Sequence, residues 1–205
     1  FTIKTHDDGT VKMCKARLVV LGNHTEEGIH WFDNFASTMK WPSNRTLIAL
    51  ATKNRFAVKK LIDVSTAFLY YALEPGTLIF VKGIPGYEEY DCDGNVLCKQ
   101  LFKSAYGVPS APAAFHKGNE KLLCKKCNMS KCTVDPNVYS IKRGRSILHI
   151  GTHVDDFACF SNDINLFNDV KAIISKDYDI TESEMTCLLG VNVENNAEDG
   201  SCHIH

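Results

Sequence analysis

The sequence lacks long hydrophobic runs and lacks an excess of charge of either sign. Its longest apolar runs, such as residues 18–21, stop far short of the roughly 20 residues that a membrane-spanning helix needs. Lys4 and Asp8 interrupt any early apolar segment, so we expect no secretory signal at the start. Lys and Arg number 23 and Asp and Glu number 24, giving a net charge of -1. Overall charge therefore gives no support for nucleic-acid binding and leaves that question to local charge.

The composition is that of a folded globular protein. The hydrophobic fraction is 44% and the charged fraction is 23%, which excludes a chain that is disordered throughout. The length of 205 residues predicts one domain or two joined lobes, and no internal repeat is visible. The chain begins without Met, and both Phe1 and residues 201–205 read like the middle of strands. We therefore expect a fragment of a longer protein.

The nine cysteines do not form an obvious disulfide framework, because their number is odd and they are scattered. Most of them stand among apolar residues, which predicts buried, reduced thiols in a cytosolic protein. Cys124, Cys127 and Cys132 resemble half of a zinc site. A structural zinc site needs four ligands, and no second pair follows at a suitable spacing. A small zinc-dependent interaction module is therefore only the third interpretation.

The order of predicted elements is mixed. Alternation and turn residues predict strands at 13–21, 58–64, 78–81, 96–102, 137–142, 146–154, 157–160, 178–181 and 188–193. Helices are predicted from Pro42 to Phe56 with Ser43 as the cap, over 111–127, and after Ser161, which we expect to cap the third helix. Because hairpins and helices are interleaved, the pattern favours an α+β fold, an antiparallel sheet with helices packed on one face.

Three carboxylates stand at the ends of apolar strands. Asp63 closes the strand 58–64, and Asp155 and Asp156 form the tip of a predicted hairpin. Adjacent acids at a turn are common and usually mean only a turn. A third acid at the end of another apolar strand is costly unless it is solvated, paired or bound to metal. If the three meet on one sheet, they can hold two Mg²⁺ ions, the arrangement used for phosphoryl transfer.

Four sequence motifs, taken together, resemble one family. They are Lys15-Ala-Arg-Leu-Val19 followed by Gly22, Asp63-Val-Ser-Thr-Ala-Phe-Leu69, Ser104-Ala-Tyr-Gly107 with Ala111-Pro112, and His153-Val-Asp-Asp156. In this order and at these spacings the chain resembles the reverse transcriptase domain of copia-type LTR retrotransposon Pol polyproteins. The resemblance covers essentially the whole chain.

The resemblance implies a fold, an activity and partners. The fold would be the fingers and palm of a right-hand polymerase, with fingers at about 1–56 and 76–110 and palm at about 57–75 and 111–205. The activity would be RNA-directed DNA polymerisation with two Mg²⁺ ions, which Mn²⁺ can replace. The partners would be an RNA template, a DNA primer and dNTPs, with no membrane. The thumb, RNase H and integrase would lie elsewhere in the Pol polyprotein, in a cytoplasmic virus-like particle or in the nucleus.

The resemblance also assigns roles to individual residues. Asp63, Asp155 and Asp156 would be the catalytic, metal-binding carboxylates, with Asp156 more peripheral. The nucleotide-binding residues would be Lys15 and Arg17 on the triphosphate, Phe68 as the steric gate against a ribose 2′-hydroxyl, and Tyr106 and Gly107 near the nascent base pair. His153 would lie beside the primer terminus. Strand alternation would turn Lys15 and Arg17 to the same side, and some lysines of helix 111–127 would lie near template phosphates.

Several supporting positions depart from the family pattern. His153 replaces the usual Tyr, Val108-Pro109-Ser110 replaces "LKQ", and Ser37-Thr38 replaces the end of "FAPV". The leading interpretation is an active polymerase domain. The alternative is a catalytically decayed relic that keeps the fold and weak nucleic-acid binding. Without the family, Phe68 would be read as a core aromatic residue and the lysines of helix 111–127 as a solvated face.

Overall fold

The computed structural model describes residues 1–6, 8–196 and 201–205, which form two compact units. The hairpin unit contains residues 1–34 and 68–114, and the sheet unit contains residues 35–67 and 115–205. None of the helices in the described ranges has the length and apolar character that crossing a membrane requires.

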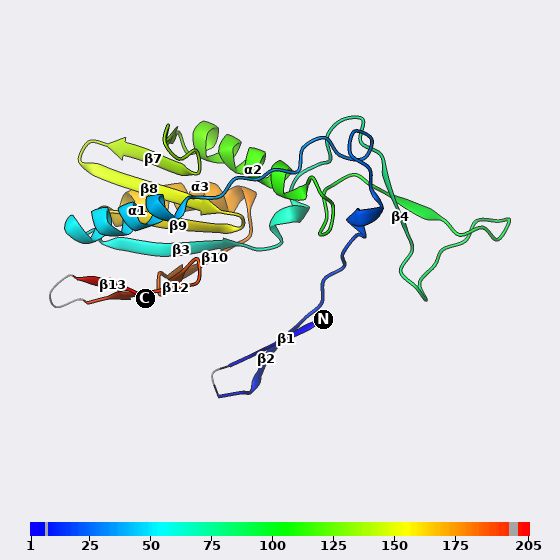
Figure 1. Cartoon of the computed structure of the whole chain (residues 1–205), viewed down its shortest axis with the longest axis horizontal. Coiled ribbons are helices and arrows are strands. Elements are labelled where there is room, and N and C mark those ends of the chain that lie inside the picture. Colours follow the sequence, from blue (N-terminus) through cyan, green and yellow to red (C-terminus); the bar gives the residue numbers. More distant parts are fainter. Residues whose placement is uncertain (7, 197–200) are drawn as a thin grey trace. The chain divides into compact units, whose positions relative to one another are not determined.

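A six-stranded antiparallel sheet forms the centre of the sheet unit (Figure 1). The strand order is β10-β3-β9-β8-β7-β6. The bounds are β3 Val58–Val64, β6 Ser130–Lys131, β7 Val138–Arg143, β8 Ser146–His153, β9 Asp156–Ser161 and β10 Ile180–Glu184. In β9, every residue from Phe157 to Ser161 is buried, which is typical of a strand covered on both faces.

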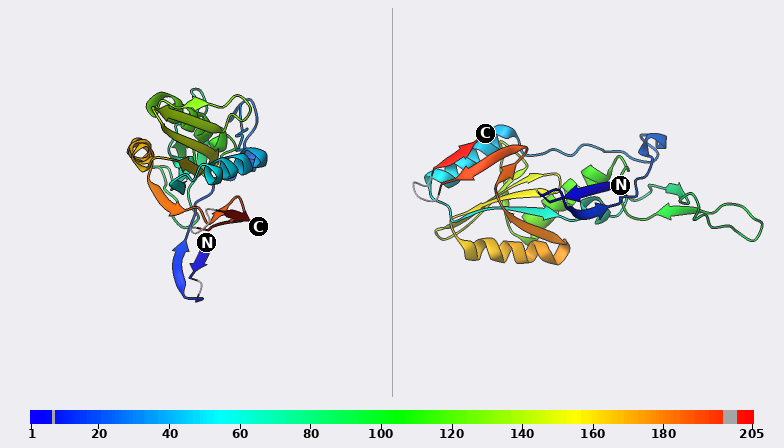
Figure 2. Two further views of the ribbon diagram at one scale, coloured as in Figure 1. Left: turned by 90° about the vertical axis from the view of Figure 1, so that its left-hand side faces the viewer. Right: turned by 90° about the horizontal axis from the view of Figure 1, so that it is seen from below.

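Helices cover both faces of this sheet, so the prediction of helices on one face is wrong. Leu47, Ile48 and Ala51 of α1 (Trp41–Lys53) pack with Ala158 and Phe160 of β9. Helix α3 (Ile164–Asp177) lies on the opposite face. Side chains of β9 alternate between the two faces, so this face is apolar as well. Figure 2 shows α1 and α3 on opposite sides of the strands. A sheet that is apolar on both faces requires a cover on each.

The remaining elements of the sheet unit extend these two layers. Helix α2 (Ala111–Lys121) begins in the hairpin unit and continues into the sheet unit, where it is followed by a π-helical turn at Leu122–Lys126. Its Asn119 accepts a 2.7 Å hydrogen bond from the buried hydroxyl of Tyr178, next to the end of α3. A small sheet of β11 Cys187–Leu188, β12 Val191–Asn195 and β13 Cys202–Ile204 contributes Leu188 and Val193 to the core under α1.

The helix caps differ from the predicted ones. Helix α1 begins one residue before Pro42, and its first turn is capped by Asp135 from a distant segment rather than by Ser43. The backbone N–H of Lys40 donates to Asp135 Oδ2 at 2.8 Å. Helix α3 is capped by Asp163, which accepts from the backbone N–H of Asn165 at 2.8 Å. The predicted cap Ser161 instead donates to the carbonyl of Ile147, at 2.8 Å.

The hairpin unit has two small antiparallel sheets, formed by β1 Thr2–Thr5 with β2 Val11–Lys15 and by β4 Ile79–Lys82 with β5 Cys98–Leu101. The predicted strand at 13–21 therefore ends at Lys15. Beyond it, the N–H of Val20 donates to the carbonyl of Tyr106 at 2.7 Å. Gly107 has φ +89°, and any side chain there would collide with the carbonyl of Val20. Two segments thus cross at a distance that only glycine permits.

Two further local predictions are corrected. The strand predicted at 188–193 is a hairpin, because β11 ends at Leu188 and β12 begins at Val191. Cys159 is buried as expected, but Cys14, Cys98 and Cys187 are exposed. All nine cysteines are free thiols. Alternating apolar neighbours indicate burial only where a second layer covers the strand, and these three strands lie in small sheets.

The buried carboxylate of Asp135 is tied into three segments. Its side chain caps α1, accepts the N–H of Asn137 at 3.1 Å and is hydrogen-bonded by Ser43. Burial acts to raise the pKa of Asp135, but these hydrogen bonds outweigh it and hold the pKa below its ordinary value. The charged form is therefore the one that stabilises the fold.

We predict that Asp135→Ala lowers the free energy of unfolding by about 2 kcal/mol, because it removes a helix cap and leaves buried N–H groups unpaired. Asp135→Asn keeps the acceptor but loses the charge and should cost less. Since the folded pKa is depressed, the advantage of Asp over Asn is complete above the unfolded pKa of about 3.9 and disappears as pH falls through the folded value. Urea unfolding at pH 7 and at pH 3 measures both effects. A constant difference between wild type and Asp135→Asn at the two pH values would contradict this account.

Candidate active site

Three carboxylates and one imidazole meet at one end of the six-stranded sheet. Asp63 of β3 lies directly opposite Asp156 of β9, and Asp156 lies directly opposite His153 of β8. Directly opposed residues of antiparallel strands have Cα atoms about 4.5–5.5 Å apart, with side chains on the same face. Asp155 joins them from the β8–β9 turn, where its carbonyl accepts the N–H of Val64 at 2.9 Å. The register therefore sets Asp63 and Asp156 side by side at this sheet end, with Asp155 in the adjoining turn, and the metal-binding role of the three acids stays a prediction.

The turn that carries Asp155 is strained. It consists of two residues, and the first of them, Val154, has φ +53°. Two-residue hairpins favour positive φ at this position because such turns match the twist of the strands. A β-branched residue pays about 1–3 kcal/mol for this conformation. The ladder between β8 and β9 on one side and the Val64–Asp155 hydrogen bond on the other hold the turn in place.

The electrostatics of the cluster favour a cation. Burial raises the pKa of Asp156, and the charges of Asp155 and Asp63 raise it further, while His153 acts in the opposite direction. Asp63 is exposed and the other two acids are half-buried, so solvent and ions can reach them. Carboxylate oxygens are the donors that Mg²⁺ prefers.

The acids fit a divalent ion by donor type and by charge. In their present rotamers, however, they do not form a ready-made cage: within the described ranges, no group of three or more His, Cys, Asp or Glu side chains is arranged to hold a metal.

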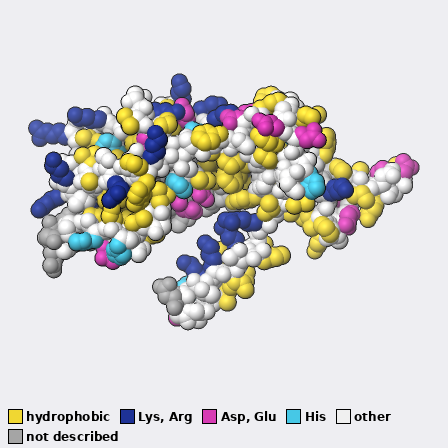
Figure 3. Space-filling model, viewed as in Figure 1, with side chains coloured by type: hydrophobic (Ala, Val, Ile, Leu, Met, Phe, Trp, Pro, Cys, Tyr) yellow, Lys and Arg dark blue, Asp and Glu magenta, His cyan; other side chains and the backbone are white. Residues whose placement is uncertain are grey.

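The opposite end of the same sheet is basic. Figure 3 shows Lys and Arg side chains gathered over α1 and the hairpin of β7 and β8. Exposed residues of this end are Lys53, Arg55, Arg143 and Arg145, and Arg143 pairs with Asp169 at 3.0 Å. Of the lysines of helix 111–127, some of which are predicted to lie near template phosphates, Lys126 pairs with Asp177 at 2.7 Å. Lys131, which follows this range, pairs with Glu120 at 2.6 Å. These two are therefore engaged within the protein.

The predicted nucleotide-binding residues lie in the hairpin unit, and most of them contact one another. The Arg17 guanidinium stands 5.3 Å from the ring centroid of Tyr106, and the Tyr106 ring meets Phe68 edge-on at 5.6 Å. Gly107 makes the close crossing described above. Lys15 is the last residue of β2 and Arg17 lies beyond the strand. The prediction that strand alternation orients both side chains is therefore wrong, and the Tyr106 ring is what holds Arg17.

Phe68 has features of both of its interpretations. It is half-buried and packs against the apolar cluster of Ile79, Val108 and Ala111. Its partner Tyr106 also holds Arg17. Phe68 is therefore a core residue by its packing. Through Tyr106 it is also a neighbour of Arg17, the candidate phosphate ligand.

Sequence reasoning missed a polar cluster beside the acids. Ser37, His116 and Asn137 are mutually hydrogen-bonded, although they come from three distant segments. The only sequence signal was Ser37, which stands where the family motif has Pro.

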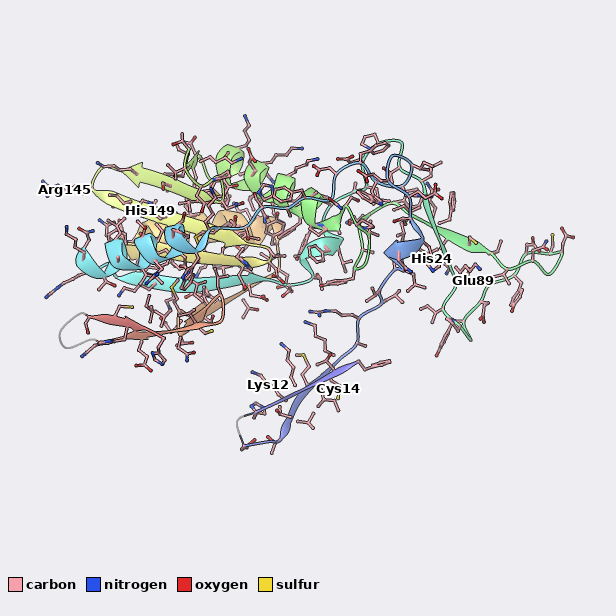
Figure 4. The ribbon with its side chains drawn as sticks, in the orientation of Figure 1. Lys12, Cys14, His24, Glu89, Arg145 and His149 are labelled. Atoms are coloured by element: carbon pink, nitrogen blue, oxygen red, sulfur yellow. The ribbon has the colours of Figure 1, made fainter. Side chains whose placement is uncertain are left out.

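Two other candidates do not join the acid site. His149, labelled in Figure 4, lies on β8. It stands four residues before His153, which is about 13 Å away along the strand. Burial lowers the pKa of His149, and its Nδ1 contacts the hydroxyl of Ser140 at 2.7 Å. Burial raises the pKa of the Cys127 thiol to about 11, which disfavours the thiolate that a zinc site needs.

Comparison with known proteins identifies the family of the chain. The family model for reverse transcriptase (RNA-dependent DNA polymerase) matches residues 1–204. The chain is 27% identical to the retrovirus-related Pol polyprotein from transposon RE1 and 29% identical to that from RE2, both from Arabidopsis thaliana, over 95% of its length. It is 32% identical to the Pol polyprotein from transposon TNT 1-94 of Nicotiana tabacum over 89% of its length.

The chain spans 13% of the length of each of these three relatives. The family model and these relatives confirm the resemblance to copia-type Pol polyproteins that the motifs indicated. With a family model covering all but the last residue, this chain belongs to the reverse transcriptase (RNA-dependent DNA polymerase) family.

Proposed function

We propose that this chain carries the nucleotidyl-transfer site of an RNA-directed DNA polymerase within a copia-type retrotransposon Pol polyprotein. The observation that carries the proposal is the assembly of Asp63, Asp155 and Asp156 at one sheet end. Membership of the family supports the reaction type. The substrates are dNTPs, with a DNA primer on an RNA template.

The acids serve as metal ligands in this proposal. Asp63 and Asp155 hold two Mg²⁺ ions, or Mn²⁺ in their place, and Asp156 is more peripheral. When bound, the ions make the primer 3′-hydroxyl a better nucleophile and neutralise charge on the triphosphate and pyrophosphate. The protein's own contribution is to hold three carboxylates together, although burial of Asp156 and the charges of Asp155 and Asp63 raise the pKa of Asp156. The strained turn and the β3–β9 register supply the position.

Residues of the hairpin unit bind the nucleotide in this proposal. Arg17 and Lys15 contact the triphosphate, Phe68 excludes a ribose 2′-hydroxyl, and Tyr106 with Gly107 lies near the nascent base pair. The contacts from Arg17 to Tyr106 and from Tyr106 to Phe68 support a single binding surface. A cation held against an aromatic face keeps its charge available to an anion while its orientation is restricted.

The larger assembly follows from the same proposal. Fingers correspond to about 1–56 and 76–110, and palm to about 57–75 and 111–205. The thumb, RNase H and integrase lie elsewhere in the Pol polyprotein, which acts in a cytoplasmic virus-like particle or in the nucleus.

Asp155→Asn tests the central assignment. It should lower primer extension by at least about 10²-fold, because the side chain keeps its size but loses the charge that binds metal. The measurement is single-nucleotide extension with Mg²⁺ in the full-length Pol protein that carries this chain. The matched control is Asp169→Asn, an exposed acid on α3, which should extend like the wild type.

Equal rates for wild type and Asp155→Asn would refute the metal-binding role of Asp155. A wild-type protein that folds and binds primer–template but extends nothing would be the decayed relic instead.

Phe68→Val tests the steric gate. It should raise ribonucleotide incorporation relative to deoxynucleotide incorporation by about tenfold or more, because a smaller side chain leaves room for a 2′-hydroxyl. The control is Phe102→Val, an exposed Phe of the same unit. The ratio of kcat/KM for the two nucleotides is the measured quantity. If Phe68→Val lowers stability without moving this ratio, Phe68 is a core residue only.

His153→Tyr tests the primer side. The larger ring should pack better against the sugar of the last primer nucleotide, and about 1 kcal/mol of added burial corresponds to roughly fivefold faster extension. Exposed His203 provides the control substitution His203→Tyr. Extension rates that do not differ between wild type and His153→Tyr would leave His153 without a role at the primer.

A further inference from the structure

A polar cluster centred on the buried Asn137 joins three segments of the sheet unit near the acids. Ser37 precedes α1, His116 lies on α2, and Asn137 precedes β7. Asn137 is 1% exposed, and its Oδ1 is 2.9 Å from His116 Nε2 and 3.2 Å from Ser37 Oγ. An amide oxygen only accepts, so both partners must donate to it, and His116 carries its hydrogen on Nε2. The two lone pairs of the Asn137 oxygen are thereby used.

The backbone of Asn137 is fixed on both sides. Its N–H donates to Asp135 Oδ1 at 3.1 Å, so the residue is tied to the cap of α1. Its carbonyl accepts the N–H of Thr152 at 2.8 Å and the Thr152 hydroxyl at 3.4 Å. Because Asn137 is hydrogen-bonded through its N–H, its carbonyl and its side chain, it has little conformational freedom. Its hydrogen bonds to Thr152 therefore restrict the position of Thr152 as well.

Thr152 is held from a second direction as well. Its carbonyl accepts the N–H of Met39 at 2.9 Å, and the Met39 side chain occupies the place where a Cβ of Gly151 would lie. Thr152 is buried and is followed directly by His153 and the turn that carries Asp155. The chain of contacts therefore runs from Ser37 and His116 through Asn137 and Thr152 to the catalytic turn.

The hydrogen bonds that hold Thr152 help to maintain the strained backbone conformation at Val154. A β-branched residue at φ +53° keeps that conformation only when its surroundings over-determine it. β3 restrains the Asp155 side through the Val64 N–H, and the β8 side of the turn needs an equivalent hold. The Asn137–Thr152 connection is placed to provide it.

We propose that Asn137, oriented by His116 and Ser37, is a positioning residue that fixes the β8 side of the catalytic turn through Thr152. This inference rests on the proposed function for its catalytic consequence. Its structural part, the restraint on the turn, does not depend on activity. Loss of this restraint would change the placement of Asp155 and Asp156, rather than the binding of the incoming nucleotide.

The variants are chosen around one hydrogen bond. His116→Leu removes the donor to Asn137 Oδ1 and keeps a side chain of similar bulk, whereas His116→Gln offers an N–H again. Asn137→Ala removes the acceptor itself. The matched control is Ser140→Ala, which deletes the 2.7 Å contact to His149 between the same two strands at a distance from the turn.

Amide hydrogen exchange of residues 151–158, measured by mass spectrometry, is the first readout. His116→Leu and Asn137→Ala should each exchange at least about tenfold faster there than wild type, while His116→Gln and Ser140→Ala should stay within about twofold. Unchanged exchange in both His116→Leu and Asn137→Ala, or an equal rise in Ser140→Ala, would overturn the proposal. Should Asn137→Ala fail to fold, the His116 pair still decides.

Single-nucleotide extension in the full-length Pol protein is the second readout. His116→Leu should lower kcat about tenfold with KM for the dNTP unchanged within about twofold, and His116→Gln should recover most of the loss. Faster exchange with an unchanged kcat, or a His116→Gln variant as slow as His116→Leu, would also refute the positioning role. A wild-type protein without extension activity refutes the proposed function alone, and the exchange experiment then judges the restraint.

Discussion

The register between β3, β9 and β8 is the constraint on which the candidate site depends. It sets Asp63 against Asp156 and Asp156 against His153, so Asp63 shares one face at one sheet end with two residues that come much later in the sequence. Because side chains alternate along a strand, a slip of one residue would turn Asp63 to the other face. Apolar layers on both faces of β9 make such a slip costly, since every buried side chain of the strand would change sides.

Two energetically unfavourable features lie next to this register, and neighbouring contacts maintain both of them. The first is the burial of Asp156 beside two other carboxylates, which together raise the pKa of Asp156. The second is the backbone strain at Val154. Both lie at the same turn, and the surrounding structure fixes it from β3 and from the Asn137–Thr152 side. Unfavourable local terms that a rigid framework maintains are common at sites that bind a ligand, because binding then relieves them.

The hairpin unit is not ordered by a large buried sheet. Its sheets are small and many of its apolar side chains are exposed, among them Phe1, Phe80 and Phe102. What orders its candidate residues is a crossing of two backbones at Gly22 and Gly107, with the Tyr106 ring between Arg17 and Phe68. The glycines are required there because a side chain would collide with the opposite carbonyl.

The sequence by itself determined the elements whose cause is local. The strands at 58–64, 137–142 and 146–154 follow from alternation and turn residues, and the structure has them within a residue or two. The third helix likewise begins shortly after Ser161. The four motifs also determined the family and, with it, the acids that the sheet brings together.

Only the tertiary structure decided the rest, because its causes lie far apart in the sequence. The cap of α1 comes from Asp135, about 95 residues away from Lys40, so no local pattern could name it. Coverage of both sheet faces depends on where α1 packs, which helical spacing does not specify. The Arg17 guanidinium lies against the Tyr106 ring, and Asn137 is hydrogen-bonded to Thr152, two residues before the β8–β9 turn. Hydrogen bonds and ring contacts of this kind exist only once packing has brought their partners within reach.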